Sequence, residues 1–328
     1  MSLLIYDVIQ LPNQDAMSRS KYMMLLFALV VTLCACSPRK LAVREITAIA
    51  ANGMTALEQD DDLDMLAQAL PANIKLLEMV LASNPDDGEL LTLLARSYGS
   101  YNFMILEPKF EKARFHLLAL DTNDDIETEA LHLKQTVSRY YQKGAAYALK
   151  ALEVDHPDTL AQLKNVSTID AFIRDLGPRE VAAVFWYGFN LAAWVNLNLD
   201  SVQALCQGHI AEKCMRRVIE LQPAYFHGAA HLVLIAYYAS RSPMLGGNLN
   251  AARRHYDALK QISGDAFLMA DLFYARYYLQ RTQDRPACES LLDEIARAAG
   301  QKSAYPLFNK VAGHKAHIYL TALNELFE

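Results

Sequence analysis

The helical spacing of apolar residues, interrupted at intervals by turn residues, constrains the fold of this chain most. Before the pair Asn84-Pro85, apolar residues keep helical spacing at Leu77, Val80 and Leu81. After the pair the spacing resumes at Leu90, Leu91, Leu94, Tyr98 and Tyr101. This pattern predicts two antiparallel helices joined by a short turn. No credible strand run occurs, so we predict an all-α protein.

A small residue and two apolar residues recur at spacings of four and three, with a turn residue five positions later. This spacing is typical of the second helix of a tetratricopeptide repeat, in which the small residue lets a neighbouring helix approach. The turn marks from Pro85 to Ser263 are separated by 40, 32, 66 and 40 residues, an irregular period. We therefore predict stacked helix hairpins in a degenerate tetratricopeptide-like array over residues 46–328, with an irregular helical bundle as the alternative. The three segments are Ala145, Leu149, Leu152 and Pro157; Ala211, Met215, Val218 and Pro223; and Ala113, Leu117, Leu120 and Asp125.

The N-terminal part has the layout of a bacterial lipoprotein signal. Arg19 and Lys21 precede the apolar run 23–32, and Leu33-Cys34-Ala35 then leads to Cys36. The run is too short to span a bilayer as a mature helix. We expect three segments here. They are 1–16, upstream of a true start at Met17; 17–35, the signal peptide; and 36–45, a tether.

Cys36 is the expected lipid attachment site. A lipid there, such as palmitate, would tether a soluble periplasmic protein, so we expect contact with the membrane through the anchor only. Ser37, rather than Asp, follows Cys36 and favours the outer membrane of a Gram-negative cell. The alternative is an apolar segment with incidental thiols. The later apolar stretch 181–199 is interrupted by Gly188, Asn190 and Asn196, and we do not expect it to span a bilayer.

Composition and charge fit a large globular helical protein. The chain has 53% hydrophobic residues and 21% charged residues, with only 13 Gly and 11 Pro. Its formal net charge of -6 comes without a basic patch, which argues against a nucleic-acid partner. Cys206 and Cys214 could bridge a helix-to-helix turn, but a free buried pair is at least as consistent with the sequence.

The glycine-rich stretch 242–248 resembles a phosphate loop only superficially. It lacks the GK[ST] element and does not follow a strand. We interpret Gly246 and Gly247 as a structural turn, because glycine allows a left-handed backbone before a helix capped by Asn248 or Asn250.

Motifs for catalysis or metal binding are incomplete. His227 and His231 lie four residues apart, but no Glu follows the first and no third ligand is placed by the sequence. A GxSxG motif is absent from the chain. The sequence therefore predicts no enzyme, no metal site and no cofactor.

One helix that is apolar on two faces is the candidate wall of a ligand cleft. Trp186, Asn190 and Trp194 form one stripe at helical spacing, and Phe185 and Phe189 lie on another. Such a helix is buried on both faces or borders a cavity, and core packing is the alternative. Apolar walls and tyrosine hydroxyls would suit a ligand with a carboxylate or headgroup. The predicted cleft residues are Trp186, Tyr187, Asn190, Trp194, Tyr98, Tyr101 and Tyr238.

Five segments together make the chain similar to the T-component family of TRAP transporters, the TRAP-associated lipoproteins called TatT. The match spans essentially the whole mature chain, and the segments are individually loose but jointly specific. They are "NPDDGELLTLLARSYGSYNFMILE" (84–107), "VFWYGFNLAAWVNLNLD" (184–200), "AEKCMRRVIELQPAYFHGAAHLVLIAYYASRSPMLGGNLNAARRHYDALKQISGDAF" (211–267), "YARYYLQRTQDRPACESLLDEI" (274–295) and "LFNKVAGHKAHIYLTALNELF" (307–327).

This resemblance implies a partner and an assembly that the residues alone do not. It implies a periplasmic lipoprotein of tetratricopeptide-like repeats that forms a homotrimer and engages the solute-binding P subunit of a TRAP transporter. It also implies an apolar cleft or pore for hydrophobic ligands, such as lipids or small organic acids. Cys288 and the short tail after Phe327 depart from the family pattern and affect local contacts only.

Two functions from different classes follow. One is a transport accessory that holds a partner and passes a hydrophobic solute. The other is an envelope scaffolding lipoprotein, whose repeat grooves organise protein partners without a ligand. An apolar through-cavity favours the first function, and a solid core favours the second. The sequence does not identify the solute.

We predict that Cys36→Ser abolishes lipid attachment, because the thiol is the acceptor in a lipoprotein signal. The variant should appear as a soluble or unprocessed precursor when cells are fractionated and precursor and mature forms are separated by mass. A processed Cys36→Ser protein that stays in the membrane fraction would contradict the assignment.

Overall fold

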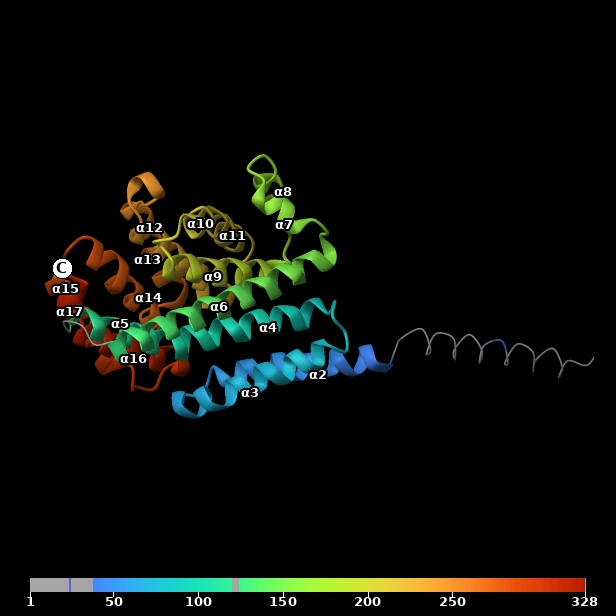
Figure 1. Ribbon diagram of the computed structural model, residues 1–328, viewed down its shortest axis with the longest axis horizontal. Coiled ribbons are helices and arrows are strands. Elements are labelled where there is room, and N and C mark those ends of the chain that lie inside the picture. Colours follow the sequence, from blue (N-terminus) through green and yellow to red (C-terminus); the bar gives the residue numbers. More distant parts are fainter. Residues whose placement is uncertain (1–23, 25–37, 120–123, 328) are drawn as a thin grey trace, which may run out of the picture.

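The fold is α-helical throughout the residues that the structure describes. The computed structural model describes residues 24, 38–119 and 124–327, and no strand occurs in these ranges. Figure 1 shows α4, α6 and α9 side by side through the middle of the molecule, with α2 and α3 packed along α4. The predicted class, all-α with stacked helix hairpins, is confirmed. The elements are α2 (Pro38–Leu57), α3 (Leu63–Leu81), α4 (Gly88–Tyr101), η1 (Asn102–Leu106), α5 (Glu107–Ala119), α6 (Asp124–Asp155), α7 (Thr159–Lys164), α8 (Ile169–Asp175), α9 (Val181–Leu197), α10 (Val202–Leu205), α11 (Gly208–Leu221), η2 (Tyr225–Gly228), α12 (Ala229–Ser240), η3 (Pro243–Leu245), α13 (Leu249–Ser263), α14 (Leu268–Phe273), η4 (Tyr274–Leu279), α15 (Arg285–Ala298), α16 (Pro306–Thr321) and α17 (Leu323–Leu326).

The hairpin predicted around Asn84-Pro85 is formed by α3 and α4. Asp62 begins α3 by accepting a hydrogen bond from the backbone N–H of Met65, and Asp87 begins α4 by accepting one from Leu90. The six residues between the helices hold the turn. Local capping and apolar spacing therefore define this hairpin.

The recurring turn residues also mark helix ends. Pro157 lies two residues after the end of α6, and Pro223 lies two residues after the end of α11. The helices differ greatly in length, from 4 residues in α10 to 32 in α6. The hairpins therefore stack without a uniform repeat length, and the tetratricopeptide type of the repeat stays a prediction.

Two helices contain a π-helical segment instead of a break. The first, η1, joins α4 to α5 in one continuous helix, and the second, η4, continues α14. A π segment holds one residue more per turn than an α-helix and is often found at a functional site.

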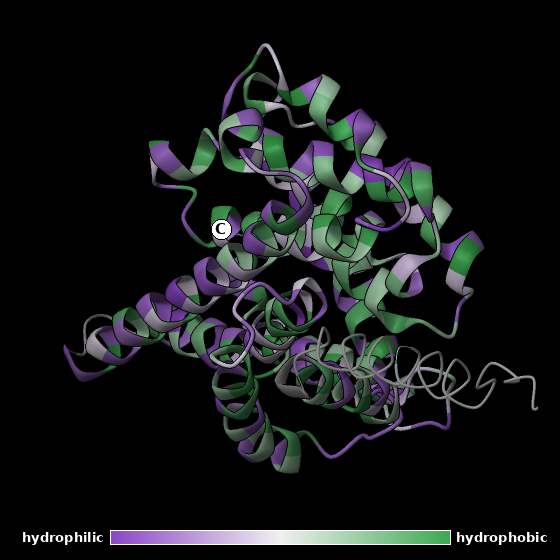
Figure 2. Cartoon of the chain, turned by 90° about the vertical axis from the view of Figure 1, so that its right-hand side faces the viewer, coloured by the Kyte–Doolittle hydropathy of each residue, from purple (hydrophilic) through white to green (hydrophobic). Residues whose placement is uncertain are grey.

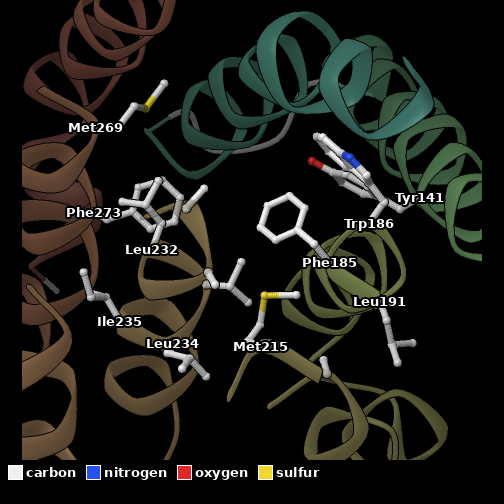
Figure 3. Packing of buried hydrophobic residues seen from close by; sticks show 14 of the residues in the cluster. Tyr141, Phe185, Trp186, Leu191, Met215, Leu232, Leu234, Ile235, Met269 and Phe273 are labelled. Atoms are coloured by element: carbon white, nitrogen blue, oxygen red, sulfur yellow. The ribbon is translucent and has the colours of Figure 1, made fainter. Parts of the chain in front are cut away.

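Helix α9 occupies the centre of the hydrophobic core. Phe185 and Trp186 are essentially inaccessible, at 0% and 1% exposure, and their rings meet edge to face with centroids 4.9 Å apart. Figure 3 shows both rings enclosed between neighbouring helices. The double-sided apolar pattern in the sequence thus reflects burial on both faces of α9.

Asn190 on α9 holds three helices at close range. Its Nδ2 donates to the carbonyl oxygens of Trp186, at 2.7 Å, and of Ala95 on α4, at 3.2 Å. Its side chain lies against Gly99 of α4 and Gly144 of α6, where any Cβ atom would overlap the amide. The two glycines therefore make room for a polar side chain at the crossing of α4, α6 and α9.

The turn containing Gly246 and Gly247 lies between η3 and α13. Gly246 has φ of 88°, in the left-handed region that favours glycine. A Cβ atom on Gly247 would overlap the carbonyl oxygen of Arg241. Asn248 caps α13 through a 2.9 Å hydrogen bond from the backbone N–H of Ala251. The turn therefore requires glycine at both positions, at Gly246 for its backbone angle and at Gly247 for lack of space.

The predictions for the cysteines, the tether and the membrane-spanning character can also be compared with the structure. Cys206 is exposed and Cys214 buried, and both thiols are free. Cys36 lies outside the described residues, and α2 begins at Pro38, within the expected tether 36–45. Hydrophilic and hydrophobic residues alternate along the helices in Figure 2. In the described ranges, no helix combines the length and apolar character needed to cross a membrane.

We predict that Gly144→Ala destabilises the fold by about 1 to 3 kcal/mol, because its methyl group would displace Asn190 from between α4 and α6. Gly53→Ala is the matched control: this glycine is also helical, and nothing lies within 4 Å of its Cβ position. The control should be neutral or stabilised, by up to about 1 kcal/mol, from helix propensity. Urea unfolding measures both, and equal midpoints for Gly144→Ala and the parent would contradict the packing role of Asn190.

Candidate functional site

A cavity of about 400 Å³ lies between α5, α9, α12 and η4. We call it the Arg276 cavity. Its volume lies within the range typical of small-molecule sites. Residues exposed to solvent, such as Leu199 and Gln283, border its mouth. Apolar side chains form much of its wall: Phe103, Phe189, Ala192, Ala193, Val233 and Phe273.

Charged side chains from three parts of the chain also line the Arg276 cavity. Helix α5 supplies two glutamates and an arginine, and the other arginines come from the end of α12 and from η4 and its continuation. A site with both apolar walls and charges suits a ligand with two chemically different ends. The charged lining residues are Glu107, Glu111, Arg114, Arg241, Arg276 and Arg281.

Lys315 of α16 neutralises the two glutamates. Its Nζ donates to Glu107 Oε1 at 2.6 Å and to Glu111 Oε2 at 2.8 Å, and only 2% of its side chain is exposed. Burial lowers the pKa of Lys315, but the two carboxylates outweigh burial and hold this pKa well above its usual value. Lys315 is therefore charged across the physiological pH range.

Two buried tyrosines complete the Lys315 network. Tyr141 donates to Glu107 Oε2 at 2.6 Å, and Tyr319 donates to Glu111 Oε1 at 2.8 Å. Burial and the adjacent carboxylates raise the pKa of both hydroxyls, so both stay protonated as donors. Every oxygen of the two carboxylates has a partner, which permits their burial.

Arg276 is held between aromatic rings at the cavity wall. Its guanidinium carbon lies 5.4 Å from the ring centroids of both Tyr277 and Tyr319. Tyr277 in turn accepts a 3.1 Å hydrogen bond from Asn196 Nδ2. These contacts fix the position of Arg276 while leaving its guanidinium without a carboxylate partner within ion-pair distance in the described part of the chain.

Both π-helical segments border the cavity. Phe103 of η1 and Arg276 and Tyr277 of η4 are wall residues. Phe103 belongs to the continuous helix α4–η1–α5, and Phe273 belongs to α14, which η4 continues. The centroids of their rings lie 6.0 Å apart. The cavity thus forms where two helices locally leave α-helical geometry.

The structure places the four cleft residues predicted on α9 away from the lining of the Arg276 cavity. Trp186 packs against Phe226 with ring centroids 5.1 Å apart, and Asn190 lies between α4 and α6. Tyr187 and Trp194 are buried, at 5% and 8% exposure. Helix α9 does border the cavity, through Phe189, Ala192, Ala193, Asn196 and Leu197. The ligand role of the four named residues stays a prediction.

The predicted tyrosine anchors lie in separate places. Tyr98 donates to Glu78 at 2.6 Å, and the half-buried Tyr101 packs near the Tyr140 ring. Tyr238 donates to Glu212 at 2.7 Å. Burial alone would raise the pKa of Glu78, but hydrogen bonds from Lys75, Tyr98, Lys143 and Tyr147 lower it to about 2. Tyr98 and Tyr238 thus donate to carboxylates of this chain.

The two histidines singled out in the sequence have different partners. His227 Nε2 lies 3.1 Å from Glu58 Oε2, and His231 Nδ1 lies 3.0 Å from His255 Nδ1. Burial lowers the pKa of both His231 and His255 to about 4, so both are neutral at pH 7. In the described ranges, no group of three or more metal-binding side chains occurs.

Sequence reasoning missed the charged residues of the Arg276 cavity. A usable signal was present: Glu107, Glu111 and Arg114 are spaced by four and three, on one face of α5. Lys315 likewise interrupts an otherwise apolar face of α16. Their convergence depends on helices more than 200 residues apart along the chain, which spacing alone does not relate.

Comparison with known proteins places the chain among transport components. A family model described as "TRAP transporter T-component" matches residues 59–327. A protein of Treponema pallidum (strain Nichols), described as "Uncharacterized protein", is 25% identical over 204 residues. That alignment spans 61% of this chain and 60% of the relative.

We predict that Lys315→Met destabilises the protein by about 3 to 5 kcal/mol at pH 7, because two buried carboxylates lose the cation that bridges them. The exposed Lys310→Met on the same helix is the control and should change stability by less than about 0.5 kcal/mol. A variant as stable as the control in urea unfolding at pH 7 would contradict the network.

Proposed function

Because this chain belongs to the TRAP transporter T-component family, we propose that it is a lipid-anchored periplasmic accessory component that holds a solute in the Arg276 cavity. The family supports an accessory role in TRAP transport and favours a role without catalysis. The scaffolding alternative requires no ligand space inside the chain.

The Arg276 cavity is the observation that carries this proposal. It offers about 400 Å³ between helices, with aromatic and aliphatic walls. Its lining includes Phe189 and Phe273, whose rings present apolar surface to a solute. A scaffold that only binds proteins through outer grooves gives no reason for such a space.

The remaining parts of the proposal concern anchoring and partners. We propose that Cys36 carries the lipid, that the outer membrane is the site of anchoring, and that the solute-binding P subunit of a TRAP transporter is the partner. We also propose a homotrimer. The family model supports association with a TRAP transporter. Co-purification of the P subunit with the lipidated chain, and the mass of the isolated complex, test the partner and the trimer.

We predict that filling the cavity removes a bound solute. The half-buried Ala193 lines the cavity, so Ala193→Phe should place a ring in the solute space. Solvent extracts of the purified full chain, examined by mass spectrometry, should contain a small molecule that the variant lacks. Ala51→Phe, on an exposed position of α2 away from the cavity lining, is the control and should retain it. Equal extracts from both variants and the parent, with all three proteins folded, would contradict solute binding in this cavity.

A further inference from the structure

Helix α2 carries an apolar face that is exposed to solvent. Val43 and Thr47 are buried on the side of α2 that faces the other helices. Another side presents small and apolar residues at spacings of four and three, which place them along one line of the helix. We call these residues the α2 face: Ala42, Ile46, Ile49, Gly53 and Ala56, all of them exposed.

The rest of the described chain leaves the α2 face uncovered. Ile49 is 70% exposed and Ile46 is 42% exposed, although isoleucine is among the residues most often buried. Apart from α2 itself, no described atom lies within 4 Å of the position that a Cβ atom on Gly53 would take. From Ile46 to Leu57, α2 contains no charged residue, whereas a helix surrounded by water normally has a charged outer side. The α2 face therefore fits an apolar surface better than water.

The start of α2 lies next to the proposed lipid site. Cys36 comes two residues before Pro38, the first residue of α2. Two residues of chain span at most about 7 Å. A lipid on Cys36 enters the bilayer and therefore keeps the start of α2 at the level of the lipid headgroups. The rest of α2 can either lie on the bilayer or project from it, and an uncovered apolar face favours the first arrangement.

Basic residues gather at the same end of α2. Its first seven residues include Arg39, Lys40 and Arg44 but no acidic residue, and Glu45 is the one acidic residue of the helix. Clusters of basic residues next to a membrane are attracted to anionic lipid headgroups. The charge of α2 is thus concentrated near the proposed anchor, and the apolar face continues beyond it. This combination fits a helix that lies in the membrane interface.

We propose that α2 lies flat on the lipid bilayer, with the α2 face turned toward the acyl chains and its basic start near anionic headgroups. The proposal rests on the lipid at Cys36 in the proposed function and adds a second contact to it. The sequence predicted membrane contact through the anchor only. A helix on the bilayer would also fix which side of the chain faces the membrane. Burial of apolar side chains and attraction of basic residues both favour this arrangement.

Quenching of tryptophan emission by brominated acyl chains tests the proposal, because bromine quenches only the indole rings that it approaches closely. The full lipidated chain is placed in nanodiscs of phosphatidylcholine and phosphatidylglycerol, with either brominated or unmodified acyl chains. The reporters are Ile49→Trp and Ala56→Trp, at positions about 17 and 27 Å along α2 from Pro38. Ala51→Trp is the matched control, since Ala51 is exposed and lies on the opposite side of α2 from Ile49. The emission of the parent, from its two buried tryptophans, is subtracted, and circular dichroism melting establishes that each variant is folded.

Brominated lipid should lower the added emission of both reporters about twofold or more and leave the control nearly unchanged. A helix that projects from the bilayer would leave Ala56→Trp unquenched, and a contact that is not one-sided would quench Ala51→Trp equally; either result overturns the proposal. Unquenched reporters with blue-shifted emission, in a protein with the mass of an oligomer, would instead assign the α2 face to a second copy of the chain. These outcomes leave the lipid anchor intact as long as the chain stays in the nanodiscs. A folded parent that does not enter the nanodiscs would overturn both the anchor and the helix contact.

Discussion

The crossing of three helices at one buried amide is the constraint on which the rest of the structure depends. Asn190 fits between α4, α6 and α9 only because Gly99 and Gly144 carry no side chain. Its Nδ2 joins two backbone carbonyl groups across the crossing, while its Oδ1 is buried without a partner among the described residues. Close approach at this point sets the spacing of the helices. Phe189, next to Asn190 on α9, lies in the wall of the Arg276 cavity, so the crossing and the cavity share this helix.

Local signals predicted much of the fold. The pair Asn84-Pro85, the cap Asn248 and the double-sided apolar pattern of α9 each act within a few residues. Such short-range preferences survive folding because packing reinforces them. The ends of α6 and α11, marked by prolines, belong to the same group.

The candidate site could not be predicted in the same way. Whether an aromatic ring of a buried helix faces a core or a cavity depends on the partner helices, so Trp186 and its neighbour Phe189 have different surroundings one turn apart. The charged residues carried a clearer signal than the aromatic ones, although the sequence prediction did not use it. Burial of a lysine requires nearby carboxylates, and Lys315 finds them on α5, over 200 residues away in sequence. Sequence shows that such a residue needs a partner but does not identify it.

The π-helical segment η1 also affects how freely the chain can vary in length. One residue corresponds to about 100° of rotation around an α-helix, so the wider turn at residues 102–106 resets the face that α5 presents after α4. Loss of one residue there would restore regular α-helix and turn Glu107 and Glu111 away from Lys315. A deletion that costs a surface helix little would here remove the ion pairs that join α5 to α16. The length of this helix is therefore as tightly constrained as the identity of its charged residues.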